Sequence, residues 1–274
     1  MAGTHDWKGQ AGDGWAQEWR RTDRSFGGLT ERLLSRTRDF AFSSVLDIGC
    51  GAGELSLAIG RGRPHARVIG VDISRSLIEV ARKRGERLLN VDFELSDAAQ
   101  WQPSSGFSPK LLVSRHGVMF FDDPVAAFSH FAAVSAPDAN LLFSCFREPQ
   151  ENEIFSGVGA LLPPPETPPD PKAPGPMAFA DRDHVRSILT SAGWKDIGFE
   201  PYDFAMVVGM GEDAADDAIS YLLSIGTAAA RLPDMPPAEQ EAFHGRLRAF
   251  VESRVIDGLV ALRAAAWIVT ARRA

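Results

Sequence analysis

The sequence predicts an α/β fold built on a doubly wound, mostly parallel sheet, and three observations support this prediction. Short β-rich runs alternate with helical segments from about residue 43 to residue 142, the pattern of a parallel sheet covered by helices. A glycine-rich turn joins the first of these runs to a helix. The 274 residues are 45% hydrophobic and 24% charged, as in a globular chain with one sizeable core.

Five β-rich runs are expected to form the parallel part of the sheet. They are residues 43–49, 66–72, 91–97, 109–115 and 139–146. Between the second and third runs, Ser76 and Glu79 have the spacing of a capping box, and apolar residues follow at helical spacing. This segment is predicted to be a crossover helix that begins near Ser76.

The second half of the chain contains a clear helix and two long strands. Asp181 has the position of a helix N-cap, and Gly193 stands where a C-terminal glycine belongs. Residues 194–208 and 259–273 are expected to be long strands, separated by a mainly helical insertion over 211–257.

Composition and charge exclude several classes of function. The net charge of −7, from 29 basic and 36 acidic residues, repels phosphate backbones and argues against a nucleic acid partner. The sequence has neither a signal peptide pattern nor an apolar run of roughly 20 residues, so we expect a cytoplasmic protein without a membrane span. Cys50 and Cys145 lie in apolar surroundings and are interpreted as packing residues.

The glycine turn is the first candidate binding feature. Gly49, Gly51 and Gly53 lie between an apolar strand and a helix that begins near Glu54. Glycines there let the backbone turn sharply and approach a ligand at the helix N-terminus. The dinucleotide fingerprint requires glycine where Glu54 stands, so an NAD-dependent dehydrogenase is the less favoured alternative.

Three acidic residues stand at the ends of the first three predicted strands. Because ligands bind beyond the carboxyl ends of parallel strands, Asp47, Asp72 and Asp97 are expected to line one crevice. Asp72 can accept both hydroxyls of a ribose, and Asp97 with the backbone of Ala98 can meet the amino edge of an adenine. Asp47 can help to hold the ammonium group of an amino acid. Any one such aspartate is more typical of a turn or cap, but three in register with the glycine turn favour a binding site.

These stretches resemble the motifs of class I S-adenosylmethionine-dependent methyltransferases. VLDIGCGAG is similar to their first motif, GVDIS to the acidic second, LSDAA to the adenine-binding third and LLVSRHGVMFF to the fourth-strand motif. VMFFDDPVAAF resembles the ubiquinone-biosynthesis-like small-molecule branch. The resemblance extends over nearly the whole chain and implies a Rossmann-like, seven-stranded sheet with an antiparallel last strand and helical cap insertions.

The resemblance also implies a cofactor and a reaction. S-adenosyl-L-methionine would bind, S-adenosyl-L-homocysteine would be the product, and a small, partly apolar molecule would be methylated, with oxygen slightly favoured over carbon or nitrogen. The alternative is a protein of the same fold that binds the cofactor but catalyses a non-transfer reaction such as cyclisation. The expected cofactor-binding residues are Asp47, Gly49, Gly51, Gly53, Asp72, Ile73, Asp97, Ala98 and Ser114.

The segment after the fourth strand is expected to lie nearest the transferred methyl group. His116 is either a base for a substrate hydroxyl or a residue that packs under the cofactor. Arg115 either pairs with a substrate anion or bonds a loop carbonyl. Met119 and Phe120 are core residues or part of the substrate wall.

The remaining segments surround this predicted catalytic domain, which comprises residues 43–147 and 181–274. Residues 1–42 are expected to be helical, with Trp15 and Trp19 on one helix face, and either pack on the domain or cover the cofactor pocket, where Trp15 would meet the substrate. Proline-rich residues 148–180 form a stiff surface loop or a lid.

Two further expectations concern partners and metals. The insertion at 211–257 serves as a substrate cap or as the interface of a homodimer. Asp122 and Asp123 precede Pro124 as at a helix start, and no third oxygen ligand follows at a fixed spacing, so no metal site is predicted.

Overall fold

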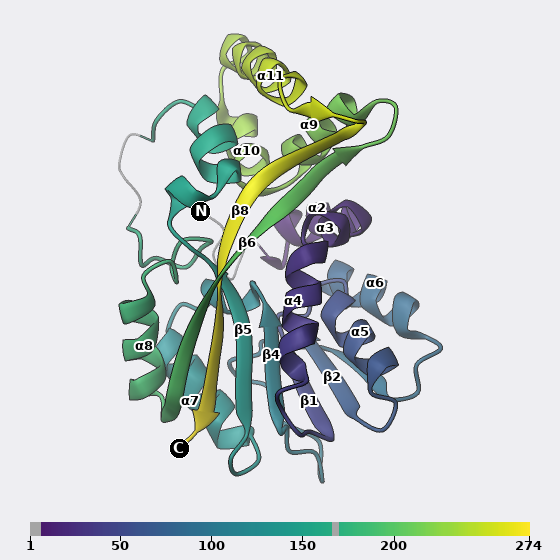
Figure 1. Ribbon diagram of the computed structural model, residues 1–274, viewed down its shortest axis with the longest axis vertical. Helices are drawn as coiled ribbons and strands as arrows, with labels where there is room; N and C mark the ends of the chain where they lie inside the picture. The colour runs from purple at the N-terminus through teal and green to yellow at the C-terminus, as the bar shows by residue number, and fades with distance from the viewer. Residues whose placement is uncertain (1–6, 166–169) are drawn as a thin grey trace.

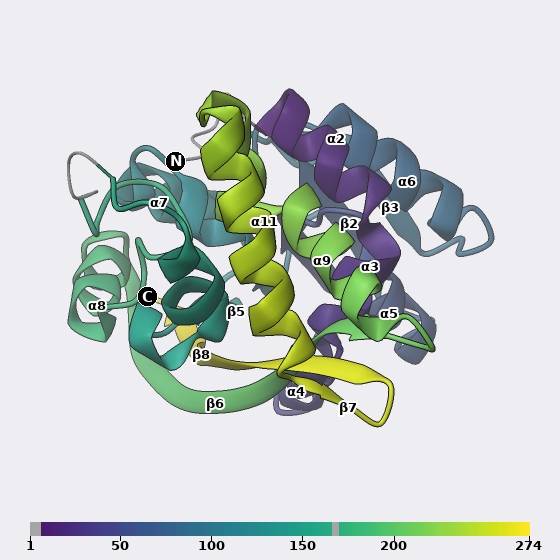
Figure 2. The same cartoon turned by 90° about the horizontal axis from the view of Figure 1, so that it is seen from above.

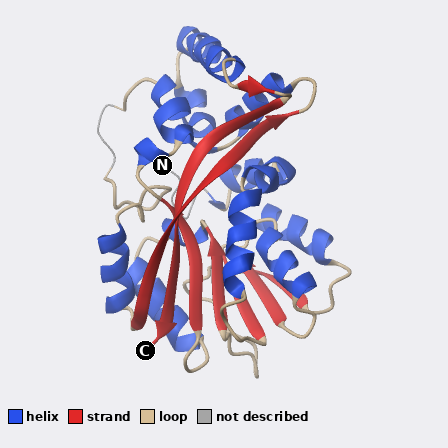
Figure 3. Cartoon of the chain, viewed as in Figure 1, coloured by secondary structure: helices blue, strands red, loops and turns tan. Residues whose placement is uncertain are grey.

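The computed structural model describes residues 7–165 and 170–274. In Figure 1 a twisted sheet with helices on both faces fills the lower half of the molecule. The two longest strands rise out of this sheet and carry a separate group of helices at the top. Figure 3 shows the same division by secondary structure, with the strands in red fanning out below the helical group.

The sheet has the order β3-β2-β1-β4-β5-β8-β6. Neighbouring strands from β3 to β5 are parallel, whereas β8 is antiparallel to both β5 and β6. Because the chain moves outward from β1 to β3 and then returns to β4, the order reverses between β1 and β4. The bounds are β1 Ser44–Ile48, β2 Arg67–Asp72, β3 Val91–Leu95, β4 Leu111–Arg115, β5 Asn140–Phe146, β6 Trp194–Met210 and β8 Leu259–Arg273. The predicted fold class and the antiparallel last strand are confirmed.

Helices cover both faces of the sheet, as a doubly wound fold requires. Helix α5 contacts α4 and α6 on one face, and α7 contacts α8 on the other. The bounds are α2 Gln10–Gln17, α3 Trp19–Ser25, α4 Gly27–Thr37, α5 Glu54–Gly62, α6 Arg75–Gly85, α7 Pro124–Val134 and α8 Arg182–Ser191. Among the described helices, none is long and apolar enough to cross a membrane.

The central strands are buried on both faces, which explains their apolar sequences. In β1 and β4 the residues at Val45, Leu46, Leu111, Leu112 and Val113 are at most 1% exposed. A parallel strand covered by helices on both sides has no solvated face, so its sequence need not alternate. The two cysteines are free and buried, which confirms the prediction that they pack.

The start of α6 differs from its prediction. Ser74 lies in extended backbone and its side chain accepts a hydrogen bond from the amide of Leu77, so the helix begins at Arg75 and Ser74 is the N-cap. Ser76, the predicted cap, instead bonds the carboxylate of Asp13 on α2. The prediction for Ser76 was therefore wrong, because a better-placed serine precedes it by two residues.

The starts of α7 and α8 follow their predictions. The carboxylate of Asp123 accepts a hydrogen bond from the amide of Ala126 at 2.9 Å. The carboxylate of Asp181 accepts a hydrogen bond from the amide of Asp183 at 2.8 Å. Gly193 follows the end of α8 and has a φ of 83°. Side-chain caps of this kind satisfy amides that have no partner within the helix.

The helical insertion between β6 and β8 forms a cap over one end of the sheet (Figures 1 and 2). It contains α9 Ala214–Ser224, α10 Gly226–Arg231, α11 Pro237–Glu252 and the two-residue strand β7 Val255–Ile256, which pairs with β8. The helical prediction for 211–257 is confirmed except at β7. Its apolar faces pack within the chain, since Leu222, Phe243, Leu247 and Val251 are at most 2% exposed.

The proline-rich segment is more structured at its start than predicted. Residues 149–161 form short helical turns, η2 Pro149–Glu151, η3 Ile154–Val158 and η4 Gly159–Leu161. Residues 166–169 lie outside the described part of the chain. Beyond them the loop returns to the sheet, where the amide of Gly175 donates to the carbonyl of Met119 at 3.0 Å.

Candidate active site

The candidate site lies at the carboxyl ends of β1, β2 and β4, where the strand order reverses. Ligands in open α/β sheets bind at such a point. The amide of Cys50 donates to the carbonyl of Val71 at 3.0 Å, and the amide of Ser96 donates to the carbonyl of Asp72 at 3.0 Å. These bonds hold the turn after β1 beside the end of β2, and the end of β2 beside the end of β3. The structure therefore brings the three predicted aspartates to one edge of the sheet.

The glycine turn has the backbone that its sequence predicts. Gly49 and Gly51 have φ values of 62° and 54°, a region that residues with a side chain rarely adopt. A Cβ on Gly49 would lie 2.9 Å from the Cα of Gly117, so glycine permits the turn to touch the segment after β4. A Cβ on Gly51 would meet none of the described atoms within 4 Å. Gly51 thus faces open space, where a ligand can reach the main chain.

Asp47 lies in the core beneath this turn and is 1% exposed. Its Oδ2 accepts a hydrogen bond from Ser56 Oγ at 2.6 Å, while its Oδ1 has no hydrogen-bond partner among the described residues. Burial raises the pKa of Asp47 to about 7, against the opposing effect of the Ser56 hydroxyl. A buried oxygen without a partner costs free energy until a donor reaches it. Asp47 is therefore suited to pair with a cationic group.

Asp72 connects the glycine turn to α6. Its Oδ2 accepts from the amide of Gly51 at 2.8 Å and its Oδ1 from the amide of Ser74 at 2.8 Å. Burial raises the pKa of Asp72, and these amides partly offset that effect. The amide of Ile73 also lowers this pKa, so three main-chain amides act on the carboxylate, and a ligand would use the lone pair that they leave. Ile73, the next residue, is half-buried.

Asp97 begins a turn that is partly exposed. Its Oδ1 accepts from the amide of Ala99 at 2.9 Å and its Oδ2 from the side chain of Gln100 at 3.3 Å. Ala98 beside it is 9% exposed. The carboxylate thus shapes the turn at the end of β3 and has a half-buried surface of its own.

Ser114 and His116 occupy the end of β4. Ser114 Oγ donates to the carbonyl of Ile48 at 2.7 Å and accepts from the amide of Gly117 at 3.1 Å, so it braces the chain between the two strands. His116 has a φ of 63°, and its ring stacks on Phe146 with centroids 4.1 Å apart. His116 therefore projects from a strained turn against an aromatic residue of β5.

The imidazole of His116 has one engaged and one free nitrogen. Its Nδ1 lies 3.2 Å from Ser144 Oγ, whereas the buried Nε2 lacks a partner in the part of the chain that the structure describes. Burial lowers the pKa of His116 to about 3, although the Ser144 carbonyl raises it. The ring is consequently neutral at physiological pH and is a weak base.

Arg115 does not extend into the crevice as a free cation. Its guanidinium donates to Thr30 Oγ1 at 2.8 Å and pairs with Asp23 at 3.3 Å. Asp23 also pairs with Arg84 at 2.7 Å. Sequence reasoning missed Asp23 and Arg84, because no spacing rule connects a residue of α3 with one of α6.

The N-terminal segment contacts the segment after β4 and the start of α6. Trp7 contacts Phe120, which follows β4, edge to face, with ring centroids 5.1 Å apart. The ring centroids of Trp7 and Trp15 are 5.9 Å apart. At the other end, a Cβ on Gly12 would lie 2.4 Å from Ser74 Oγ, so only glycine allows this approach of α2 to α6. Trp15 is half-buried.

One of the predicted placements, that of Trp15 and Trp19, differs in the structure. The helix breaks at Glu18, so Trp15 and Trp19 lie on different helices and not on one face as predicted. Trp19 instead stacks under the guanidinium of Arg84 at 3.9 Å. Met119 is 1% exposed and packs in the core, whereas Phe120 is half-buried.

Sheet order, switch point and glycine turn together define a Rossmann-like methyltransferase fold. Residues 45–138 match the family model described as a methyltransferase domain. This stretch contains strands β1 to β4, and it is similar to the class I S-adenosylmethionine-dependent methyltransferases.

Curated relatives agree with this assignment. Trans-aconitate 2-methyltransferase of Paracidovorax citrulli is 30% identical over 133 residues, which cover 48% of this chain and 47% of the relative. Ubiquinone biosynthesis O-methyltransferase of Hahella chejuensis is 30% identical over 117 residues, which cover 42% of this chain and 48% of the relative. The chain spans about half the length of the curated relatives it matches.

Solved structures share the fold over most of the chain. Phosphoethanolamine N-methyltransferase 2 of Haemonchus contortus aligns with a TM-score of 0.57 at 15% identity, covering 100% of this chain and 60% of that one. The [4+2]-cyclase SpnF aligns with a TM-score of 0.53 at 17% identity, covering 90% of this chain and 80% of that one. At such identities the likeness concerns the fold alone.

Proposed function

We propose that the chain transfers a methyl group from S-adenosylmethionine to a small, partly apolar molecule, with a hydroxyl oxygen as the favoured acceptor. The observation that carries the proposal is that, among the described residues, Asp47 Oδ1 has no partner and lies beneath a glycine turn whose Gly51 faces open space. S-adenosylmethionine carries an ammonium group and a ribose, so its binding site requires an acidic acceptor and an accessible glycine turn side by side.

The residues of the crevice fit this cofactor. The ammonium would pair with Asp47, the ribose hydroxyls would donate to Asp72, and the adenine would lie near Asp97 and Ala98. Both Asp47 and Asp72 are buried, and charge-assisted hydrogen bonds to buried carboxylates are among the stronger ones. When bound, the cofactor supplies an electrophilic methyl group on its sulfonium.

The chain's own residues would mainly align the acceptor. Methyl transfer from a sulfonium needs little covalent assistance, so holding the two reactants in line supplies most of the rate. His116 would orient a substrate hydroxyl through Nε2, the nitrogen that lacks a partner among the described residues. Because burial keeps its pKa near 3, we propose that the ring only accepts a hydrogen bond and that the hydroxyl proton passes to bulk water as the oxygen–methyl bond forms and the sulfur–methyl bond breaks.

The surroundings of His116 favour an apolar substrate. Its ring contacts Phe26 edge to face, with centroids 5.4 Å apart, and stacks on Phe146. Arg115 and Arg84 beside the crevice both pair with Asp23, so neither is free to bind a substrate carboxylate. These contacts support a phenol or quinol better than a polycarboxylate.

Incubation with labelled cofactor and a panel of acceptors tests the proposal. The panel contains phenols, quinols, amines, simple carboxylic acids and trans-aconitate, and mass spectrometry detects products heavier by one methyl group. We expect label in a phenol or quinol. Methylation of trans-aconitate would contradict the proposed substrate class, and tight cofactor binding without transfer to any acceptor would favour the non-transfer alternative.

A further inference from the structure

A buried charge cluster links the N-terminal helices to both halves of the crevice. It consists of Asp23 on α3, Glu54 at the start of α5, Arg84 on α6 and Arg115 at the end of β4. The side chains of Asp23, Arg84 and Arg115 are 14%, 15% and 16% exposed. Charges this far from solvent are costly unless they are paired, so the geometry of the cluster is tightly constrained.

Arg84 holds the glycine turn. One guanidinium nitrogen donates to the carbonyl of Ala52, within the turn, at 2.7 Å. The other lies 2.6 Å from Glu54 Oε2 and 2.7 Å from Asp23 Oδ2. The turn and the first residue of α5 are therefore attached to α3 through a single arginine.

Arg115 holds the opposite side. It directly precedes His116, and its guanidinium pairs with the second oxygen of Asp23, Oδ1, at 3.3 Å. It also donates to Thr30 on α4 and lies over the ring of Phe26. The two oxygens of one carboxylate thus bind two arginines that hold different walls of the crevice.

We propose that Asp23 is a positioning residue of the cofactor crevice, acting through Arg84 on the glycine turn and through Arg115 on the segment that carries His116. The inference rests on the proposed function, since it concerns the same site. Asp23 touches neither cofactor nor substrate in this account. Its effect is to keep the turn and the His116 segment at a fixed separation.

The electrostatics agree with this geometry. Burial raises the pKa of Asp23 to about 6, against the attraction of Arg115 and Arg84, and Glu54 raises it further. The groups that face the carboxylate come from α5, α6 and β4. Protonation below about pH 6 would weaken both ion pairs together, so the crevice is expected to loosen in mild acid.

Calorimetry of S-adenosylhomocysteine binding to the full chain and its variants tests the inference. We expect Asp23→Asn to weaken binding about tenfold, the scale of typical coupling between a distant group and a site. Asp23→Glu keeps the charge and is expected to recover most of the affinity. The control is Asp39→Asn, since Asp39 pairs with Arg36 at 2.7 Å but is 51% exposed and lies outside the cluster.

Hydrogen exchange of the ligand-free protein supplies a second readout. Asp23→Asn is expected to speed exchange of the amides at residues 50–55 and 115–118, while Asp39→Asn leaves them unchanged. Should Asp23→Asn fail to fold, Arg84→Lys takes its place, because lysine keeps the charge but cannot reach Asp23, Glu54 and the Ala52 carbonyl together.

The outcomes separate this inference from the proposed function. If the parent protein does not bind the cofactor, the proposed function fails, while faster exchange in Asp23→Asn would still support positioning. If the parent binds and the variant binds equally, with unchanged exchange at both walls, Asp23 is only an anchor for α3 and the inference is overturned.

Discussion

Asp47 carries a buried oxygen that has no partner within residues 7–165 and 170–274, and burial raises the pKa of this carboxyl to about 7. The carboxylate must be ionised to pair with a ligand ammonium. Below its pKa, protonation competes with binding, so affinity is expected to fall as the pH falls through 7 and to level off above it.

This pH dependence is best measured as the ratio of the affinity of the parent to that of the variant Asp47→Asn. Any titration of the free ligand's own amine is the same in experiments on the parent and on Asp47→Asn, so it cancels when the two affinities are divided. From pH 8.0 to 6.5, the affinity of the parent relative to this variant should fall about fourfold by linkage with a pKa near 7. A constant ratio over this range would show that Asp47 does not meet the ammonium.

Asp72 gives a prediction with a close control. Asp72→Asn removes the charge from a buried acceptor of main-chain amides, so binding of the cofactor should weaken by about tenfold or more, as expected for the loss of charge-assisted hydrogen bonds. Asp92 stands on β3 in an exposed pair with Arg67 at 3.7 Å. Asp92→Asn should bind as the parent does, and equal affinities of all three proteins would remove Asp72 from the binding site.

His116 is expected to remain neutral in any ordinary assay buffer. Burial lowers the pKa of His116 to about 3. The pH–rate profile of the parent should therefore show no change of slope near pH 6.5, the ordinary pKa of histidine. His116→Ala should lower turnover by less than about 100-fold, since acid–base catalysis usually contributes 100-fold or more. A rise of the parent rate with pH near 6.5 that disappears in the variant would instead establish His116 as a base.

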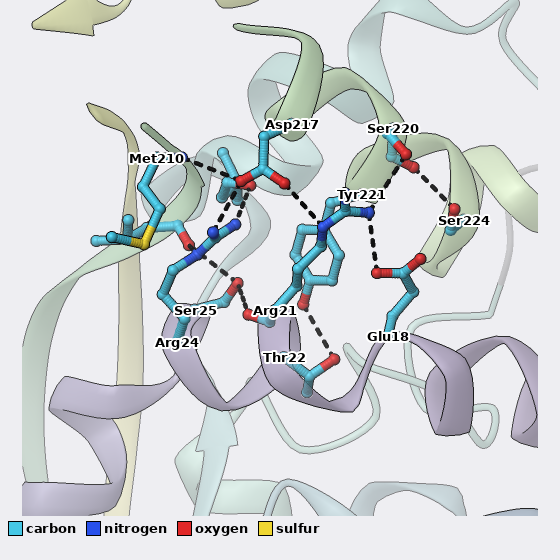
Figure 4. Close-up of polar contacts among 12 residues, drawn as sticks. Glu18, Arg21, Thr22, Arg24, Ser25, Met210, Asp217, Ser220, Tyr221 and Ser224 are labelled. Carbon is cyan, nitrogen blue, oxygen red and sulfur yellow. Dashed lines mark hydrogen bonds and ion pairs between the residues drawn. The ribbon is translucent and has the colours of Figure 1, made fainter. Parts of the chain in front are cut away.

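Among the elements, α3 is joined to the cap by a second polar network (Figure 4). Asp217 on α9 pairs with Arg21 and Arg24 at 2.8 Å each, and Arg24 also donates to the carbonyl of Val208 in β6 at 2.8 Å. Tyr221, fully buried, donates to Thr22 Oγ1 at 3.3 Å. Helix α3 thus contacts the crevice on one side and the cap on the other.

Neighbouring aspartates of α9 allow this network to be tested. Asp217→Ala removes the carboxylate that Arg21 and Arg24 share, although Arg21 keeps Glu18 and Arg24 keeps the Val208 carbonyl, and the free energy of unfolding should fall by about 1 to 3 kcal/mol. Asp216 pairs with Arg248 at 2.9 Å on the surface, where Asp216→Ala should cost at most about 0.5 kcal/mol. Denaturant unfolding of both variants measures the difference, and equal losses would show that the network does not join the two elements.

The sequence predicted elements well where local signals are strong. Buried strands, the Asp123 and Asp181 caps and the long strands 194–208 and 259–273 depend on nearby residues alone. The break at Glu18 could not be predicted, because no proline or glycine marks it. The cap of α6 moved to Ser74 because two serines compete for the same role.

For the whole molecule, the convergence of the candidate binding residues could be predicted because they follow consecutive strands. Asp47 and Asp72 stand at the ends of neighbouring parallel strands, and topology alone places them together. The pairing of Asp23 with Arg84 and Arg115 depends on how helices of the N-terminal segment pack, which no local pattern encodes. For the same reason, the pKa values of Asp47 and His116 required the structure, since burial causes both shifts.

The most direct test of the account is calorimetric titration of the full chain with S-adenosylhomocysteine and, separately, with NAD. The glycine turn followed by Glu54, with Asp47 and Asp72 beneath and beside it, predicts one binding site with micromolar affinity for the sulfonium-derived ligand and no detectable heat with NAD. Tight binding of NAD without any response to S-adenosylhomocysteine or S-adenosylmethionine would contradict the account.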